Sequence, residues 1–523
     1  MTAKKRYDVL SSNRSQFLQV AEDSSRLTLP YLIHQDESTT GARNLKTPWQ
    51  SVGAKAVVTL SAKLMLSLLP PQTSFFKLQV NESKLGDYGP EVKSELDLAF
   101  AKVEKVILES IAASDDRVVV HQAMKHLVVA GNALIFMGKD KLKLFPLNRY
   151  VIDRDGNGNV IEIVTKESIN KKIIEELVPD LRGDMKTEYG DTEESSECDV
   201  YTHVKVYGNR VTWHQEVYDK IIPKSQSKSP LNVSPWLPLR FNTVDGEAYG
   251  RGRVEEFIGD LKSLESLSQA LVEGSAAAAK VVFTVSPSSS TKPQTLAKAG
   301  NGAIVQGRPD DIGVIQVGKT ADFSTAANIM MQLEKRISEA FLILNVRQSE
   351  RTTAEEVRMT QMELEQQLGG LFSLLTVEFL VPYLDRKLNV LSKKGTIPRI
   401  PKDYVKPTIV AGINALGRGQ DRESLGMFLQ TIAQTMGPEA ISQFINPEEV
   451  VKRLAAASGI DVLNLVKSMQ EVQGQQQQQM QQQMAMQEQQ NAPAMAAVQQ
   501  KQQEAMMNAQ AQAEAGNPGQ SPA

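Results

Sequence analysis

The chain has 523 residues, of which 41% are hydrophobic and 23% charged, and its formal net charge is -3 at pH 7. This composition predicts a folded protein of three or four domains, and the charge excludes a general nucleic-acid coat, which would be strongly basic. The single cysteine, Cys198, excludes a disulfide framework. No signal-peptide pattern opens the chain, and no apolar run reaches the roughly 18 residues of a membrane helix. We therefore expect a soluble protein without a membrane span.

Residues 1–250 combine amphipathic helices with short strands. Apolar residues spaced by three and four predict helices at about 16–26, 47–69, 91–112 and 117–130. Thr47 and Pro48 have the residue types of a helix start, and Gly131 ends the last of these helices. Strand-type segments bounded by turn residues follow at 133–137, 143–145, 150–152, 160–164, 200–207 and 210–218. The pattern is typical of an α+β domain.

The next part of the chain has the order helix, β-rich insert, helix. Apolar spacing predicts the first helix over about 254–280 and the second over 320–344. Between the two helices, strand-type composition occurs at 281–285, 303–305 and 312–317. Two helices that bracket an insert are typical of a strut, and not of a catalytic pocket.

A very long helix is predicted after a polar loop. Thr353 and Glu356 form a capping box, and the helical pattern then continues to about residue 392. Gly369, Gly370 and Pro382 should bend this helix, because glycine relaxes the backbone and proline removes one hydrogen bond of the ladder.

The last part of the chain changes in composition. A proline-rich connector at 398–407 leads to short helices over 408–470, and from residue 473 Gln, Ala and Met dominate. Such a bias usually indicates disorder, but these residues are also good helix formers. We expect a marginal helix that needs neighbours.

One segment matches a nucleotide-binding motif. Residues 313–320 fit the pattern G-x-x-x-x-G-K-[ST] letter for letter. A phosphate-binding loop turns its amides inward, whereas the middle residues here are mostly bulky and apolar and favour a strand, a turn and a helix start. Nucleotide binding at Lys319 is kept as the alternative hypothesis.

No other pattern indicates catalysis or metal binding. Residues 153–159 resemble the start of an EF-hand loop, but Val164 occupies the position that requires a bidentate Glu. The five histidines have no zinc-ligand spacing: His121 and His126 are five residues apart on a predicted helix, where four are needed. We predict no catalytic residue, no metal ligand and no cofactor, and expect that the chain is not an enzyme.

Basic residues gather in the insert and in the loop before the long helix. In the insert, Lys and Arg outnumber the two acidic residues at 310 and 311, and the loop is flanked by two arginines: Lys292, Lys298, Arg308 and Lys319, then Arg347 and Arg351. On one chain these are ordinary solvated charges. Repeated around a ring, they would create a field that acts on a phosphate backbone without reading bases.

Seven segments in a fixed order carry a resemblance to a known family. They are TPWQSVGA at 47–54, LSAKLML at 60–66, HLVVAGN at 126–132, VYTH at 200–203, DGEAYGR at 245–251, TAEEVR at 353–358 and GRGQD at 417–421. In these segments the chain resembles the head-to-tail connector (portal) protein of short-tailed bacteriophages, the podophages. The resemblance covers nearly its whole length.

The resemblance implies a mainly helical α+β portal fold whose parts follow the predicted elements. They would be a wing at 1–250, stem helices at 251–280 and 320–344, a β-containing clip at 281–319 and a tunnel loop at 345–352. The remaining parts would be a kinked wing helix with its connector at 353–407, a helical crown at 408–471 and a helical barrel or disordered tail at 472–523. The Gln/Met-rich tail would lie where such portals place a barrel of helices.

The resemblance also implies where DNA and proteins would be contacted. The tunnel loop would face the channel and touch DNA through Asn345, Arg347, Gln348 and Arg351. The clip would contact the terminase motor and then the tail adaptor, near Lys292, Lys298 and Arg308.

A portal of this family is a structural channel at one capsid vertex, through which DNA is packaged and ejected. The resemblance implies a twelve-fold ring of this chain, in the virion after assembly in the host cytoplasm. Its partners would be the major capsid protein, the tail adaptor, the large terminase subunit, scaffold and internal core proteins, and double-stranded DNA without sequence preference, but no membrane. The alternatives are a P-loop NTPase that acts on phage DNA and an internal scaffold.

Overall fold

In the computed structural model of the chain, most of the first 400 residues have a defined placement. The structure describes residues 1–33, 45–71, 75–80, 90–177, 197–278, 282–289, 292–300, 302–308, 310, 312–315, 320–343, 369–398, 405–409, 418–437, 445, 450 and 500–509. The chain divides into two compact units, Met1–Leu416 and Gly417–Ala523. In the second unit the described residues include α15 (Arg418–Met436) and a helical segment at 500–509.

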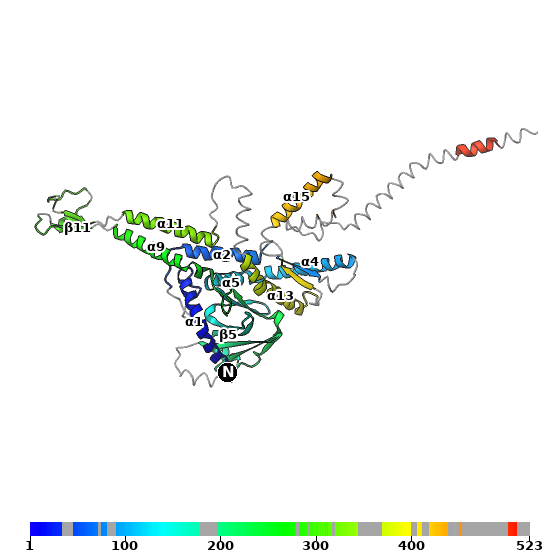
Figure 1. Cartoon of the computed structure of the whole chain (residues 1–523), viewed down its shortest axis with the longest axis horizontal. Helices are drawn as coiled ribbons and strands as arrows, with labels where there is room; N and C mark the ends of the chain where they lie inside the picture. The colour runs from blue at the N-terminus through cyan, green and yellow to red at the C-terminus, as the bar shows by residue number, and fades with distance from the viewer. Residues whose placement is uncertain are drawn as a thin grey trace, which may run out of the picture. The chain divides into compact units, whose positions relative to one another are not determined.

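The first unit mixes helices and strands (Figure 1). Its helices are α1 (Ala3–Arg26), α2 (Val52–Leu68), α4 (Pro90–Ala112), α5 (Asp116–Ala130), α6 (Lys171–Leu177), α8 (Arg253–Glu256), α9 (Ile258–Ala278), α10 (Pro293–Lys298), α11 (Thr320–Ala340) and α13 (Val381–Lys393). Short 3₁₀ turns are η1 (Leu147–Arg149) and η3 (Leu231–Val233), and η5 (Thr376–Leu380) is a π-helical turn. No described helix is long and apolar enough to span a bilayer.

The strands form four antiparallel sheets. They are β1 (Phe76–Val80), β2 (Asn132–Met137), β3 (Leu142–Phe145), β4 (Tyr150–Arg154), β5 (Val160–Asn170), β6 (Glu197–Tyr207), β7 (Arg210–Val217), β8 (Lys220–Ile221), β9 (Ser227–Pro230), β10 (Trp236–Arg240), β11 (Val282–Val285), β12 (Ile312–Ile315) and β13 (Val405–Ile409). The largest sheet has the order β4-β5-β6-β7-β8, with β9 also paired to β7; the others are β10-β2-β3, β11-β12 and β1-β13.

Two large apolar cores and two smaller clusters are found among the described residues of this unit. The larger core joins α2, α4 and α5 to the inner faces of α9, α11 and α13, with residues such as Leu60, Ile107, Leu127 and Leu261 buried completely or nearly so. The second core lies between α1, the large sheet and the end of α5. Because α5 contributes to both cores, it is the central helix of the unit.

The amino-terminal helix differs from the sequence prediction. It begins at Ala3, not near residue 16, because its first turns pack onto the large sheet. There Tyr7 meets Tyr201 with ring centroids 5.6 Å apart. Local periodicity in this polar segment is weak, and contacts with distant strands make the first turns helical.

The helix predicted to open at Thr47 begins at Val52 instead. The side chain of Gln50 holds this start, since its Oε1 accepts a hydrogen bond from the amide of Gly53 at 2.8 Å. Its Nε2 donates to the carbonyl of Leu27 at 2.7 Å. The first turn of a helix has amide groups without a backbone partner, and Gln50 bonds one of them. Gln50 thus has the capping role that the sequence predicted for Thr47.

Within the insert, the predicted strands at 281–285 and 312–317 are present as β11 and β12, of which 316–317 lie outside the described residues. The predicted strand at 303–305 is wrong, since these residues form no strand. Helix α10, which follows Lys292 and ends at Lys298, was not predicted. Pro293 stands at its first position, where its fixed φ suits a helix start.

The long helix is described only from residue 369 onward. Its geometry changes from α to π at η5, immediately before Pro382, because proline has no N–H to continue the ladder. The π turn directs Glu378 at Arg240, whose backbone N, Nε and Nη2 donate to the carboxylate at 2.8, 2.9 and 2.6 Å. The capping box at Thr353 and Glu356 lies outside the described residues.

A crossing of three glycines joins α5, β2 and α8. Gly131 ends α5 at φ +72, and a Cβ there would lie 2.5 Å from the carbonyl carbon of Arg251. A Cβ at Gly250 would meet the oxygen of Gly131 at 2.7 Å, and one at Gly252 would meet the oxygen of Val129 at 2.7 Å. Asn132 locks the crossing, because its side chain both donates to the carbonyl of Gly250 at 2.8 Å and accepts from its amide at 2.7 Å.

The crossing predicts a large effect of Gly131→Ala. Gly208 is a matched control, since it also has a positive φ of +53 but open space around its Cβ position. We expect Gly208→Ala to lose about 1–2 kcal/mol from the left-handed backbone alone. Gly131→Ala should lose about 1–3 kcal/mol more through the clash. Urea unfolding followed by circular dichroism measures the difference, and equal losses would show that the crossing relaxes easily.

Candidate functional site: the helix pair and its insert

Helices α9 and α11 form an antiparallel pair, and Figure 1 shows them side by side. Phe257, just before α9, meets Phe341, just after α11, with ring centroids 5.8 Å apart. Farther along, Ser268 donates to the sulfur of Met330 at 3.5 Å, and a Cβ at Gly274 would lie 2.8 Å from Phe323. In these three contacts the residue number rises along α9 while it falls along α11, as expected for antiparallel helices. The two helices are therefore in contact at both ends and in the middle.

The base of the helix pair is anchored in the larger core. Leu261, Leu264, Leu333 and Ile337 are all buried there. In the third turn of α9, Glu265 accepts hydrogen bonds from the amides of Trp49 and Gln50, before α2, at 2.9 and 3.3 Å. The pair is therefore rigidly fixed at this end.

Helix α11 ends in a strained turn. The amide of Ile343 donates to the carbonyl of Ser338 at 2.7 Å, and Leu342 donates to Glu339 at 3.1 Å, the pattern of a Schellman motif. Leu342 occupies the left-handed position that favours glycine, at φ +58. Lys63 of α2 donates to its carbonyl at 2.5 Å, and burial lowers the pKa of this lysine. Lys63 thus holds the chain at the point where it leaves α11.

The insert, meaning the described residues between 282 and 315, is built on a two-stranded antiparallel sheet. Its two strands pair from Val282↔Ile315 to Val285↔Ile312, and Thr284 donates to the carbonyl of Gly313 at 3.1 Å. Wherever side-chain burial is described, no residue of the insert is buried. Ile304 is fully exposed. The part of the insert whose burial is described therefore contributes little apolar burial within one chain.

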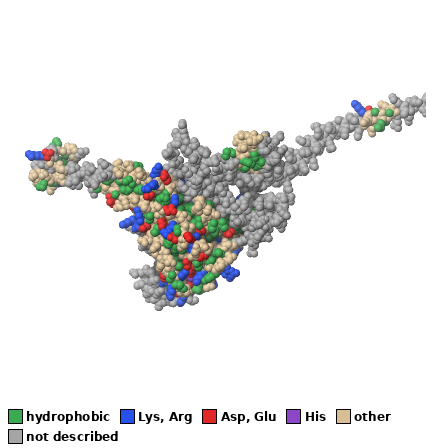
Figure 2. All heavy atoms as spheres, in the orientation of Figure 1, with side chains coloured by type: hydrophobic (Ala, Val, Ile, Leu, Met, Phe, Trp, Pro, Cys, Tyr) green, Lys and Arg blue, Asp and Glu red, His purple; other side chains and the backbone are tan. Residues whose placement is uncertain are grey.

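The three basic residues predicted for the insert are all exposed. Lys292 and Lys298 flank α10, and Arg308 lies before β12. Among the described residues none of the three has an ion-pair partner. On the face shown in Figure 2, basic side chains lie at the surface of the insert. The four predicted loop residues, Asn345, Arg347, Gln348 and Arg351, lie outside the described residues.

The first three residues of the nucleotide-binding motif belong to a strand. Gly313, Val314 and Ile315 belong to β12 and pair with β11, so their backbone groups take part in a ladder. Thr320 begins α11, and the residues between them, including Lys319, lie outside the described residues. The described part does not form the amide-lined loop that phosphate binding needs.

The EF-hand-like segment is a hairpin turn between β4 and β5. Asp155 uses its carboxylate within the turn, where it accepts from the amides of Asn157 and Asn159 at 3.0 and 2.7 Å. The side chain of Asn159 also donates to it at 2.9 Å, and these bonds lower the pKa of Asp155. The carboxylate is therefore committed to the turn.

The basic turn before α8 is a helix lead-in. Arg251 forms ion pairs with Glu247 and Glu255, and these raise the pKa of its guanidinium. The guanidinium carbon also lies 4.7 Å from the ring centroid of Phe17. Arg253 donates to the carbonyl of Ala340 at 3.1 Å, at the carboxyl end of α11, where a cation is favoured. Both arginines have structural partners.

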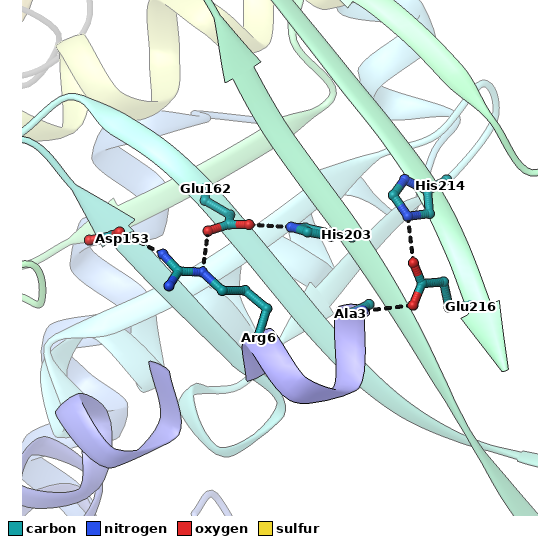
Figure 3. Close-up of polar contacts among 7 residues, drawn as sticks. All are labelled: Ala3, Arg6, Asp153, Glu162, His203, His214 and Glu216. Carbon is teal, nitrogen blue, oxygen red and sulfur yellow. Dashed lines mark hydrogen bonds and ion pairs between the residues drawn. The ribbon is translucent and has the colours of Figure 1, made fainter. Parts of the chain in front are cut away.

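A polar cluster that the sequence did not predict lies on the large sheet, beneath the first turns of α1 (Figure 3). Glu162 accepts from Nε of Arg6 at 2.6 Å and from Nε2 of His203, and Arg6 also contacts Asp153 at 3.0 Å. Burial raises the pKa of Glu162, but the bonds from His203 and Arg6 outweigh it and lower the pKa. Burial lowers the pKa of His203 against the opposing effect of Glu162.

Comparison with known proteins identifies the family. The family model described as bacteriophage head to tail connecting protein matches residues 1–466. The chain belongs to this family. Among curated relatives, the portal protein of Enterobacteria phage T3 is 36% identical over 90% of this chain and 89% of its own length. The portal proteins of Escherichia phage T7 and Enterobacteria phage SP6 are 35% and 30% identical, over 90% of this chain and 89% and 92% of their own lengths.

Membership in this family confirms the resemblance seen in the sequence. The family is structural, so the prediction that the chain is not an enzyme is also confirmed. The comparisons give no support to a P-loop NTPase. The predicted roles of individual loop and insert residues stay predictions.

The contact between Lys63 and Leu342 can be tested by Lys63→Met. Without the ammonium, the carbonyl of Leu342 loses its donor, which should weaken the turn by about 1–3 kcal/mol. Hydrogen exchange at the amides of Leu342 and Ile343 should accelerate. Lys55→Met, on the exposed side of the same helix, is the control and should leave this exchange unchanged. An unchanged rate in Lys63→Met would mean that the Schellman bonds alone hold the turn.

Proposed function

We propose that the chain is the subunit of a portal: a ring at one capsid vertex whose channel admits DNA during packaging and releases it on ejection. Membership in the head-to-tail connecting family and the names of the phage T3 and T7 relatives support this function. The protein is then a virion component, assembled in the host cytoplasm.

The observation that carries the proposal is the contrast between the anchored helix pair and the uncovered insert. A two-stranded hairpin is marginal in water when it stands alone, and none of the side chains whose burial is described in β11 and β12 is buried. The helix pair also leaves Val272, Ile329 and Met331 about half exposed. Neighbouring copies in a ring would cover these side chains and give the insert partners.

The parts of the chain take the roles that the portal family suggests. The α+β region of residues 1–250 is the wing, and α9 and α11 are the stem. The insert within 281–319 is the clip, and residues 345–352 are the tunnel loop. The helix and connector of 353–407 belong to the wing, 408–471 form the crown, and 472–523 form the barrel or tail.

The partners follow from these roles. The ring has twelve copies, is held in the shell by the major capsid protein and assembles with scaffold and internal core proteins. The clip binds the large terminase subunit, which supplies the ATPase, and later the tail adaptor. DNA passes without sequence readout, because contacts to phosphate depend on charge alone.

Electron microscopy of the purified full chain, with its mass from light scattering, tests the function. We expect rings with a central hole and a mass near a dozen copies of 57.6 kDa. Lys319→Ala should assemble and package DNA as the parent does, because this chain hydrolyses nothing. A chain that stays monomeric even with capsid partners, or ATP hydrolysis that Lys319→Ala abolishes, would overturn the proposal.

Two sets of charge-neutralising variants separate the tunnel loop from the clip. Arg347→Gln with Arg351→Gln should leave rings intact but lower DNA packaging and retention, because the channel loses its cationic ring. Lys292→Gln, Lys298→Gln and Arg308→Gln together should instead weaken binding of the terminase. Each set is the control for the other. Identical phenotypes, or rings that fail to form, would contradict these assignments.

A further inference from the structure

Strands β6 and β7 bring two histidines together on one face of the large sheet. His203 lies directly opposite His214 in the antiparallel register, and Glu216 is two residues beyond His214 on the same face. The ring centroids of the histidines are 5.4 Å apart. One ligand atom from each of the three residues lies within 4.8 Å of the others. Figure 3 shows these side chains beside Ala3 of α1.

These residue types are the ligands of transition metals. Two imidazoles and one carboxylate are a common set for catalytic-type zinc sites, with water as the fourth ligand. Ligands at 2.0–2.1 Å around a tetrahedral ion are about 3.3 Å apart, so the side chains must move inward by roughly an ångström or more. His214 can make this movement, since 26% of its side chain is exposed.

The neighbours of the three residues orient them. Nε2 of His203 is bonded to Glu162, and a carboxylate of this kind is the usual partner of a metal-binding imidazole. Oε2 of Glu216 accepts from the amide of Ala3 at 2.6 Å, while its Oε1 accepts from Nε2 of His214 at 2.8 Å. A cation would replace the proton that His214 and Glu216 share.

The surroundings of the three residues are charged, and the His203 side is open to water. Asp153, Glu162 and Glu216 bring three carboxylates to this face, and Arg6 contacts the first two of them. Lys205 is a further cation nearby. It lines an open pocket of about 330 Å³ together with Arg6, Glu162 and His203, and this pocket leaves room for water beside the histidine.

We propose that His203, His214 and Glu216 bind one divalent transition metal ion, with Zn²⁺ as the best match. The ion would join β6 to β7 and, through Glu216, hold the first turn of α1. Its role is structural: it fastens the amino-terminal helix to the sheet. The inference is independent of ring assembly, because all three ligands come from one chain.

The test uses the full chain without a histidine tag, stripped with a chelator and dialysed against ZnCl₂. We expect one zinc per chain by atomic absorption, and slower hydrogen exchange in the first turns of α1 when zinc is present. His214→Ala and Glu216→Gln should each weaken zinc binding by at least about tenfold, and Glu162→Gln by about 10–100-fold.

Two precautions keep this test decisive. His121→Ala is the matched control, because His121 is a partly exposed histidine on α5, outside the cluster, and this variant should keep the zinc. Glu216→Gln retains an acceptor for the Ala3 amide, so it decides the matter if His214→Ala does not fold. Absence of zinc from the parent chain would overturn the proposal, as would zinc that survives both substitutions or is lost equally in His121→Ala.

Discussion

The fold of the first unit depends on a close approach of backbone to backbone at Gly131, Gly250 and Gly252. Each of these residues lies where a Cβ would meet main-chain atoms at less than 3 Å. The crossing links the end of the central helix α5, the start of β2 and the lead-in to α9, so it sets the direction in which the helix pair leaves the core. Two of the sequence segments that carry the family resemblance, 126–132 and 245–251, meet at this crossing. These segments are therefore structural, and their glycines are needed for packing and not for flexibility.

Much of the local structure could be predicted, because it depends on local pattern. The helices α4 and α5 and the strands β2, β3, β4, β6 and β7 lie within a few residues of their predicted positions, and Gly131 ends α5 as expected. Strand β5 begins as predicted but continues to Asn170, six residues beyond the predicted end. The errors occur where distant contacts decide. Strand β1 pairs with β13 from Phe76↔Ile409 to Val80↔Val405. The local sequence around β1 does not indicate a partner strand so far along the chain. The early start of α1 has the same cause.

The sequence could predict which residues of the insert carry charge, but not which residues the fold brings together. The sequence indicates that Lys292, Lys298 and Arg308 are surplus cations of the insert, and all three are exposed. It could not indicate the histidine cluster. Because His203 and His214 are eleven residues apart on different strands, only the register of β6 against β7 makes them neighbours. A search for helical i, i+4 spacing passes over such a pair, whereas a search for histidines at equal distance from a hairpin turn would find it.

The two ends of the helix pair differ in what stabilises them. The base is buried in the larger core, whose other elements are joined by nearly buried ionic groups: Glu378 of η5 binds Arg240 of β10, and Asp116 of α5 accepts from Tyr383 and Lys387 of α13 at 2.6 and 2.7 Å. Removing one partner of such a pair is costly, because the other stays buried without its charge partner. At the far end, the insert has exposed side chains and unpaired cations. In the proposed ring, neighbouring copies would add contacts at this end, and symmetry would supply the same contact to every copy. A chain rigid at one end and dependent on neighbours at the other is suited to assembly around an axis, because the base fixes the angle at which each insert meets the next.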